Sequence, residues 1–253
     1  MKVLFVGLGS IGQRHLRNLR SVLGDRLEPM ACRSTDRDSV IVDGKIQAGF
    51  SLSREYGLKN FHDLDTALRA KPEMVFVTNP SSLHMPVALK AAAAGCHLFL
   101  EKPISHHLDG VKELAEIVRR QKVTVMVGYQ MRFHPGYQEL RQLLRQGQYG
   151  KVIAANFSWG TYLPSHHPYE DYRRGYAARR DLGGGVVLGL IHDIDMICDL
   201  FGQPLEVEAQ GGRLSSLEID VEDTVEAVMR FQGDAKEFPV NLFLSYARTK
   251  EQH

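Results

Sequence analysis

The feature that most limits what this chain can fold into is a glycine-rich stretch near its start, Gly7-Leu8-Gly9-Ser10-Ile11-Gly12. A short apolar run, Lys2 to Val6, precedes it, and Gln13 to Leu23 follows with the apolar spacing of one helix face. A strand, a glycine turn and a helix in this order are typical of a dinucleotide-binding unit. The alternative interpretation is a plain glycine-rich turn.

Each part of this stretch has a task in that geometry. Gly7 makes the tight turn after the strand, Gly9 lets the backbone approach a pyrophosphate, and Gly12 lets the helix pack closely on the strand. Ser10 and Ile11 stand at the start of the helix, where unpaired N–H groups bind phosphate. We therefore predict that all five residues contact a cofactor.

The choice between NAD and NADP depends on residues about 20 positions after the glycines, at the end of a second strand. That strand is predicted to run from Leu27 to Cys32. An acid at its tip favours NAD, whereas an arginine accommodates the 2′-phosphate of NADP. Arg33, Ser34 and Thr35 follow the strand, so NADP is the favoured cofactor, although Asp36 or Asp38 would restore NAD.

Two further strand ends are predicted to present polar residues at the same edge of the sheet. Met74 to Thr78 is an apolar run that ends in Asn79-Pro80, with His84 at the start of the next helix. Ligands of open α/β sheets lie beyond the carboxyl ends of the strands, so Asn79, Pro80 and His84 are candidate cofactor contacts. Ordinary turn and cap chemistry is the alternative for Asn79 and His84.

The second of these strand ends is Glu101-Lys102-Pro103, which terminates an apolar run after Gly95. Taken alone, it would be a surface Glu–Lys pair. At the fifth strand of a dinucleotide-binding sheet, it places a cationic Lys102 at the mouth of a cleft, beside a proline that fixes the backbone. Glu101 and Lys102 are therefore candidate cofactor contacts, and Lys102 is a candidate for the chemistry itself.

Strands and helices alternate through the first half of the chain. The expected elements between the strands are a loop and helix from Asp43 to Tyr56, a short helix through Ala70 with Asp63 as its N-cap, and helices at Met85–Ala94 and Leu108–Gln121; Val123 to Gly128 is a sixth strand. This alternation predicts an α/β domain with a doubly wound parallel sheet over residues 1–125. Residues 126–253 are then a second domain.

The composition excludes several classes of protein. The 253 residues are 43% hydrophobic and 24% charged with a net charge of +1, which gives no case for nucleic acid or a membrane surface as a partner. Cys32, Cys96 and Cys198 are far apart, which argues against a disulfide framework or a metal site. The chain has no apolar run of about 18 residues, and Met1-Lys2 lead directly into a strand. We predict a cytosolic protein without a metal.

The second half is predicted to be an α+β domain with an open sheet. Its expected elements are helices at Tyr137–Arg145 and Gly183–Leu200, a strand at Lys151–Trp159, and alternating runs at Glu206–Arg213, Thr224–Gln232 and Phe238–Ala247. Thr161 to Arg180 is a polar, aromatic-rich loop, and loops of this length are often functional. Tyr162 and Tyr172 in it are candidate substrate contacts; an interface or simple surface loop is the alternative.

These motifs together resemble the glucose–fructose oxidoreductase / inositol dehydrogenase / rhizopine-catabolism family. The resemblance rests on the glycine motif, the Thr-Asn-Pro turn and Glu101-Lys102-Pro103. It extends to the run from Gly128 to Pro135, which is similar to that family's G-[YF]-N-x-R-F-x-P, and to Gly183-Gly184-Gly185 followed by His192-Asp193-Ile194-Asp195. It covers residues 1 to about 245.

The resemblance implies a Rossmann domain followed by an α+β domain, and NAD(P)-dependent chemistry on sugars, cyclitols and related small molecules. It implies that Lys102 and His192 are the active-site lysine and histidine, and that the bond before Pro103 is cis. Gln130 becomes a candidate cofactor contact, and Arg132 and Asp195 become candidate substrate contacts. The family's open sheet often forms a subunit interface, which implies a homo-oligomer.

The chain departs from the family pattern in two places. An acid is expected three or four residues before the histidine, but Leu188 and Gly189 stand there. Three alternatives follow: Asp181, Asp193 or Asp195 replaces the acid, the histidines of the polar loop change the mechanism, or the site is altered. Members of the family usually run on for some 80 or more residues beyond this point, which leads us to expect an unpaired sheet edge that favours oligomerisation or instability.

The expected chemistry is hydride transfer between a nicotinamide and a carbinol or ketone. The hydroxyl must lose its proton to a positioned base, for which His192 and a desolvated Lys102 are the candidates, and Lys102 could instead polarise the oxygen. A catalytically altered nucleotide-binding sensor or regulatory protein of the same fold is the alternative.

Overall fold

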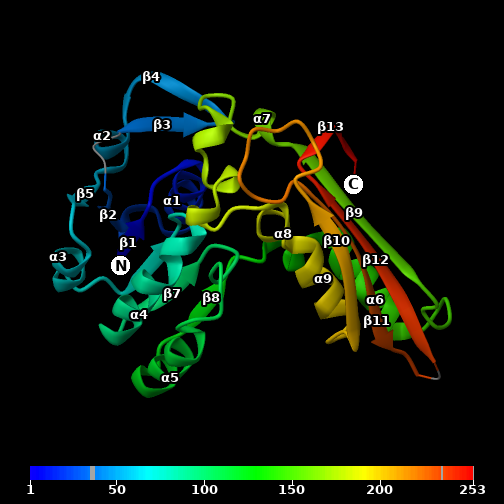
Figure 1. Ribbon diagram of the computed structural model, residues 1–253. Helices are drawn as coiled ribbons and strands as arrows, with labels where there is room; N and C mark the ends of the chain where they lie inside the picture. Colours follow the sequence, from blue (N-terminus) through cyan, green and yellow to red (C-terminus); the bar gives the residue numbers. More distant parts are fainter. Residues whose placement is uncertain (35–37, 235, 253) are drawn as a thin grey trace. The chain divides into compact units, whose positions relative to one another are not determined.

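The computed structural model describes residues 1–34, 38–234 and 236–252, and the side chains up to residue 249. The chain forms two units, Met1–Gly128 and Tyr129–His253 (Figure 1). Thr35 and Asp36, which the sequence placed near the adenosine ribose, lie outside the described residues. No helix of the described ranges is long and apolar enough to cross a bilayer.

The first unit is built on a six-stranded sheet in the order β5-β2-β1-β6-β7-β8. All neighbouring strands in it are parallel. The strands are β1 (Lys2–Val6), β2 (Glu28–Cys32), β5 (Lys59–Phe61), β6 (Met74–Val77), β7 (His97–Leu100) and β8 (Val125–Val127). The order reverses at β1 and β6, which confirms the doubly wound parallel sheet.

Helices cover both faces of this sheet because its strands alternate between two cores. Val3 and Phe5 pack with α1 and α2, whereas Leu4 and Val6 pack with α3, α4 and α5. The helices are α1 (Ser10–Leu23), α2 (Leu52–Tyr56), α3 (Leu64–Arg69), α4 (His84–Ala93) and α5 (Val111–Gln121), with short 3₁₀ turns η1 (Gly24–Arg26) and η2 (Ser81–Leu83). Asp63 caps α3 as expected, since its carboxylate accepts the N–H of Thr66.

The prediction of a loop and helix from Asp43 to Tyr56 was wrong in its first part. The first part of the segment belongs to a β-hairpin formed by β3 (Ser39–Val42) and β4 (Lys45–Ser51). Within the segment, only α2 is helical. Asp43 and Gly44 both have positive φ and form the two-residue turn. Asp-Gly after β-branched residues is a strong hairpin signal, because the required turn needs positive φ at both positions.

The second unit has a five-stranded mixed sheet in the order β10-β11-β12-β9-β13. Among the described strands of this sheet, only β12 and β9 are parallel neighbours, so the expected mostly antiparallel open sheet is confirmed. The strands are β9 (Ala155–Tyr162), β10 (Glu206–Gly212), β11 (Thr224–Gln232), β12 (Glu237–Ser245) and β13 (Ala247–Gln252). The sequence had not separated β13 from β12.

One face of this second sheet is covered. Alternate residues such as Met229, Phe231 and Leu242 are buried against Val186 and Ile197, while Val228 and Asn241 on the other face are exposed. The helical elements of the unit are α6 (Pro135–Gln146), α7 (Leu163–His166), α8 (Val186–Gly189) and α9 (His192–Phe201), and the turns η3 (Gln130–Phe133), η4 (Tyr172–Arg174), η5 (Tyr176–Ala178) and η6 (Arg180–Leu182).

The single helix predicted from Gly183 to Leu200 is two helices. Gly183 and Gly185 have φ of +77° and +109°, which a right-handed helix excludes, so α8 begins only at Val186. A break at Leu190 and Ile191 then separates α8 from α9, whose first residue is His192.

Candidate functional site

The glycine turn of the first unit has the shape that a phosphate site requires. A Cβ on Gly7 would lie 2.7 Å from the backbone nitrogen of Asn79, and one on Gly12 would lie 2.5 Å from the carbonyl oxygen of Gly7. A Cβ on Gly9 would meet nothing within 4 Å. The loop is therefore closed on the sheet side and open above Gly9, where backbone can approach a ligand.

The start of α1 leaves its N–H groups available. No side chain caps the helix at Gly9, and its first turn, which includes Ser10 and Ile11, has no acid. Uncapped N–H groups and the positive end of the helix dipole favour an anion at this position. The residues fit the pyrophosphate of a dinucleotide.

Arg33, at the tip of β2, is engaged by protein groups. Its guanidinium donates to the Asp38 carboxylate at 3.1 Å, to the Ser53 hydroxyl at 3.0 Å and to the Asn60 amide oxygen at 2.7 Å. Burial would raise the pKa of Asp38, but hydrogen bonds from Ser51, Ser53 and Arg33 lower it to about 2. Ser34 beside Arg33 is exposed.

His84 ties two loops of the carboxyl edge together. Its buried ring lies 2.8 Å from the carbonyl oxygen of Pro103 through Nδ1 and 2.8 Å from that of Asn79 through Nε2. Burial lowers the pKa of His84, and the two carbonyls oppose that effect. Within the described residues, the buried Oδ1 of Asn79 has no hydrogen-bond partner. Pro80 follows Asn79 and is the N-cap residue of η2, which precedes α4.

Glu101 is held at the end of β7 by the histidine of a different element. The Nε2 of His15, on α1, donates to Oε1 of Glu101 at 2.6 Å, and the backbone N–H of Lys102 donates to Oε2 at 3.1 Å. Gly128 packs against this carboxylate, since a Cβ there would come within 3.2 Å of Oε1. Burial would raise the pKa of Glu101, but the hydrogen bond and charge of His15 together with Lys102 lower it.

Lys102 follows immediately and precedes the cis peptide bond to Pro103. Burial lowers the pKa of its ammonium group, and the charge of Glu101 opposes that effect. A lysine desolvated in this way is easier to deprotonate than a surface lysine. It can exchange a proton nearer to neutral pH, which is what acid–base chemistry requires.

His192, at the start of α9 in the second unit, is 4% exposed. Its Nε2 lies 3.2 Å from the side-chain nitrogen of Gln130. The indole of Trp159 stacks on its ring with centroids 6.0 Å apart, and Tyr129 meets it edge-on. An amide and two aromatic rings thus fix the plane of the imidazole.

Arg132 and Asp195, predicted as substrate contacts, are paired with each other. The Arg132 guanidinium makes two bonds to Asp195, at 2.7 and 2.8 Å, and a third to Asp199 at 3.0 Å. Asp199 also accepts the Tyr137 hydroxyl at 2.7 Å. These bonds fasten α9, and with it His192, to η3 and α6.

The position of the acid expected near His192 is filled in another way. A Cβ on Gly189 would lie 1.8 Å from the hydroxyl oxygen of Tyr246. That hydroxyl donates to the carbonyl of Gly185 at 2.9 Å, and Tyr246 is 1% exposed. Burial raises the pKa of Tyr246 well above its ordinary value, so a neutral phenol occupies the space beside residue 189.

The polar loop of the second unit is ordered by its own ion pairs. Tyr162 is 37% exposed at the end of β9, and the hydroxyl of Tyr172 accepts the backbone N–H of Glu218 at 3.2 Å. Arg173 joins Asp171 and Glu218 at 2.9 and 3.0 Å. Tyr162 therefore presents its ring to a ligand more readily than Tyr172 does.

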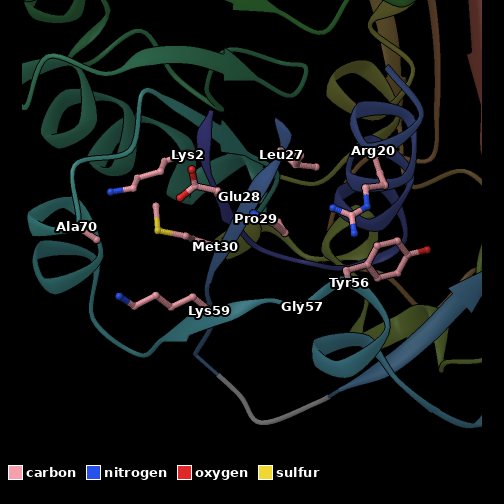
Figure 2. A pocket seen from close by; sticks show the side chains of 10 residues that line it. All are labelled: Lys2, Arg20, Leu27, Glu28, Pro29, Met30, Tyr56, Gly57, Lys59 and Ala70. Carbon is pink, nitrogen blue, oxygen red and sulfur yellow. The ribbon is translucent and has the colours of Figure 1, made fainter. Parts of the chain in front are cut away.

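A surface pocket of about 590 Å³ lies at the opposite edge of the first sheet (Figure 2). Lys2, Glu28 and Lys59, the first residues of β1, β2 and β5, line it. The glycine turn, Asn79 and Lys102 follow the carboxyl ends of the strands instead. The pocket is thus separate from the candidate cofactor and catalytic residues of this unit.

Comparison with known families decides the relationship. Residues 1–129 match the model of an oxidoreductase family with an NAD-binding Rossmann fold, GFO/IDH/MocA, and residues 137–249 match the C-terminal domain of the same family. The chain belongs to the GFO/IDH/MocA family. The family predicted from Glu101-Lys102-Pro103 and from the later glycine–histidine motif is therefore confirmed.

Members of the GFO/IDH/MocA family with assigned names are similar over most of the chain. It is 29% identical to myo-inositol 2-dehydrogenase of Thermotoga maritima over 93% of its length and 66% of that protein, and 29% identical to 1,5-anhydro-D-fructose reductase of Ensifer adhaerens over 64% and 47%. The chain thus spans two thirds or less of the length of these relatives. The WlbA dehydrogenase of Bordetella pertussis, solved with NADH and UDP-GlcNAcA, has the same fold, with a TM-score of 0.83 and 21% identity over 100% of this chain and 69% of that one.

Two residues that contact the candidate site regions, one in each unit, were missed from the sequence. His15 lies three residues after Gly12, on the helix that follows the glycine motif, and this spacing was a usable signal. Tyr246 carried no signal, because the sheet pairing that brings it beside Gly189 joins residues far apart in the chain.

Proposed function

We propose that this chain is the catalytic part of an NAD(P)-dependent oxidoreductase that transfers a hydride between a nicotinamide and a carbinol or ketone of a sugar, cyclitol or sugar derivative. The observation that carries the proposal is the buried Glu101, bonded to His15, beside a half-buried and desolvated Lys102 at the end of β7, in the same unit as a glycine turn that is open to a pyrophosphate. A surface Glu–Lys pair would be neither buried nor bonded to a histidine.

The roles of the residues follow from their surroundings. Gly7, Gly9, Ser10, Ile11, Gly12 and Asn79 would hold the dinucleotide, whose nicotinamide would supply the hydride chemistry. Lys102, with a lowered pKa, takes or returns the hydroxyl proton or polarises the oxygen. His192, fixed by Gln130 and Trp159, is the second candidate for the proton. Arg132 and Asp195 hold α9 in place rather than contacting substrate directly.

The finer choice of cofactor is proposed as NAD, which revises the preference for NADP drawn from the sequence. Arg33 is bonded to Asp38, Ser53 and Asn60, and the ionised Asp38 compensates its charge. Binding a 2′-phosphate would mean breaking those bonds or placing the phosphate beside a carboxylate. Measured KM values for NAD and NADP test this proposal, and a lower value for NADP would reverse it.

The substrate class rests on the named relatives, which act on an inositol and on an anhydro sugar. A sugar nucleotide is a further candidate, because the WlbA structure contains UDP-GlcNAcA. We also propose that the protein is a homo-oligomer through the open sheet of the second unit, where β10 is almost wholly exposed. Light scattering of the purified protein measures the subunit number.

A nucleotide-binding sensor is the second candidate function. The observation in its favour is Gly189, where the neutral Tyr246 hydroxyl takes the space in which the family's acid would lie. A sensor would bind the cofactor without converting any carbinol or ketone.

One experiment separates the two. The protein is offered NAD and NADP with a panel of cyclitols, sugars and sugar nucleotides, and reduced cofactor is followed by absorbance. Lys102→Ala is expected to lower kcat by at least about 10³-fold, because both the proton acceptor and the local charge are lost. Its cofactor Kd, measured by fluorescence, should remain within about threefold. The matched control is Lys90→Ala, which removes an exposed lysine paired with Asp65. Tight cofactor binding without turnover of the whole panel would favour the sensor.

A further inference from the structure

His15 is a half-buried titratable group for which the proposed chemistry has no use. It lies on α1, one turn beyond the glycine motif, and its side chain is 18% exposed. Phe76 and Phe99 contact its ring, with centroids 5.6 and 4.7 Å away. The two phenyl rings also stack on each other with centroids 4.9 Å apart, so the imidazole packs against the pair, with its Nε2 directed at Glu101.

The bond from His15 is the shortest of those that hold Glu101. An ionised carboxylate accepts hydrogen bonds and cannot donate them, so Nε2 of His15 carries the hydrogen. The 2.6 Å separation is typical of a strong, charge-assisted bond. The other oxygen of the same carboxylate accepts the backbone N–H of Lys102, which orients the first residue of the loop.

We propose that His15 is a positioning residue of the oxidoreductase site, which keeps Glu101 ionised and aimed so that Lys102 retains its orientation and its counter-charge. The proposal deepens the proposed function, on which it rests. It assigns the histidine of the cofactor-binding helix to the control of the lysine, with no contact to substrate required.

The charges around Glu101 are few, which makes the effect of His15 separable. In the part of the chain that the structure describes, the ionisable groups that face the carboxylate are His15 from α1, Lys102 from its own strand end and His84 from α4. Burial would raise the pKa of Glu101, and the His15 bond is the leading effect that lowers it. Without His15 the carboxyl group would become protonated nearer to neutral pH, and Lys102 would lose its counter-charge there.

The test measures Glu101 directly, in the whole protein and without substrate. Carbon-13 NMR of protein labelled at glutamate side-chain carboxyls follows the titration, and the signal absent from Glu101→Gln identifies the residue. His15→Phe keeps the aromatic packing and removes the donor, so the pKa of Glu101 should rise by about one to two units. His15→Gln places an amide donor near the position of Nε2 and should therefore reverse most of that rise.

Turnover provides the second readout, with NAD and the carbinol that the panel identifies. In His15→Phe, kcat should fall as the pH drops through a region where the original protein is unaffected, and His15→Gln should behave like the original. In a Glu101→Gln background, His15→Phe should add no further change to the pH profile. His97→Phe, which removes an exposed imidazole at the opposite end of β7, is the matched control.

The two proposals fail in different ways. An unchanged Glu101 titration in His15→Phe would overturn the role of His15, even if the enzyme turns over. Loss of thermal stability in both His15 variants without any shift in that titration would show a purely structural histidine and would overturn it as well. A shifted titration in a protein that converts nothing would leave the His15–Glu101 coupling intact and refute the oxidoreductase.

Discussion

Lys102 and His192 are held in contrasting ways. Around Lys102 the structure uses charge: Glu101 faces the lysine and is itself held by His15. Around His192 it uses shape and neutral groups: the Gln130 amide and the Trp159 ring fix the imidazole, and the Tyr246 phenol fills the turn before it.

The difference teaches how each region should fail. An arrangement based on charge responds to pH and to the loss of a single proton, because Coulomb energies change at once when a group is neutralised. An arrangement based on packing tolerates pH but not an added methyl group, since protein interiors have no spare volume. The Lys102 region should thus be sensitive to charge, and the turn before His192 should be sensitive to volume.

The largest expected effect comes from Gly189→Ala in the packed region. The new Cβ would overlap the Tyr246 hydroxyl, which is buried and bonded to Gly185, so neither side can move away cheaply. We expect a loss of about 3 kcal/mol or more in the free energy of unfolding, measured by urea denaturation.

A second substitution sharpens that result. Tyr246→Phe removes the oxygen at 1.8 Å and leaves the ring carbon at 3.0 Å, so the double variant should recover part of the loss. Gly136→Ala in α6 is the control, since its Cβ would meet only the His134 ring at an ordinary 3.5 Å. Full stability of Gly189→Ala alone would show that the turn is not packed as described.

The next effect belongs to the charged region. Glu101→Gln keeps the size of the side chain and removes the charge that raises the pKa of Lys102, so that pKa should fall further. We expect kcat to drop about 10- to 100-fold, and the limb of the pH–rate profile that reports Lys102 to move to lower pH. Glu116→Gln on the exposed side of α5 is the control. An unmoved profile would disconnect the carboxylate from the lysine.

The sequence predicted the charged region better than the packed one, for a physical reason. Glu101 and Lys102 are adjacent in the chain and stand at a strand end, so local pattern and the rule for carboxyl edges locate them together. His15 also lies at a fixed offset from the glycines, and only its partner across the sheet was hidden. Sequence motifs thus predict contacts between residues that are close together in the chain.

The surroundings of His192 come from distant parts of the chain. Tyr246 reaches Gly189 because β12 ends beside β9 and the α8 turn, and no periodicity in the sequence reports that approach. The bonds of Arg132 to α9 were equally invisible, since a charged residue in a family motif is more readily interpreted as a substrate contact. The Asp-Gly turn of the β3–β4 hairpin, in contrast, was a visible local signal that was overlooked.

A smaller loss of stability is expected from removing Arg132, the charged residue that holds α9 in the region of His192. Arg132→Met removes the bonds from the guanidinium to Asp195 and Asp199, whose side chains are each 9% exposed. Asp199 keeps its hydrogen bond from the Tyr137 hydroxyl, so Asp195 is the carboxylate that loses most of its hydrogen bonds. Because the Arg132 side chain is 42% exposed and its charge is partly screened, we expect a loss of about 2 kcal/mol in the free energy of unfolding. Arg145→Met on the exposed part of α6 should cost nothing measurable. Equal stability of the two variants would show that α9 is held in place by packing alone and not by the ion pairs of Arg132.

The smallest stability effect, and a change in cofactor choice, should come from Asp38→Asn. The pKa of Asp38 is about 2 in the folded protein, below its ordinary value of 3.8, so its contribution is complete above the unfolded value and is lost as the pH falls through the folded one. We expect a cost of about 1 kcal/mol at pH 6, after allowance for solvent screening, and a smaller cost at pH 3.

The same variant tests what Arg33 is held for. Without the Asp38 charge, the guanidinium should turn more easily towards a 2′-phosphate, so the ratio of KM for NADP to KM for NAD should fall. Asp65→Asn, which breaks an exposed pair with Lys90, should leave both the pH dependence and the ratio unchanged. A ratio that stays constant in Asp38→Asn would mean that Arg33 is fixed by Ser53 and Asn60 alone, and that charge governs the lysine but not the choice of cofactor.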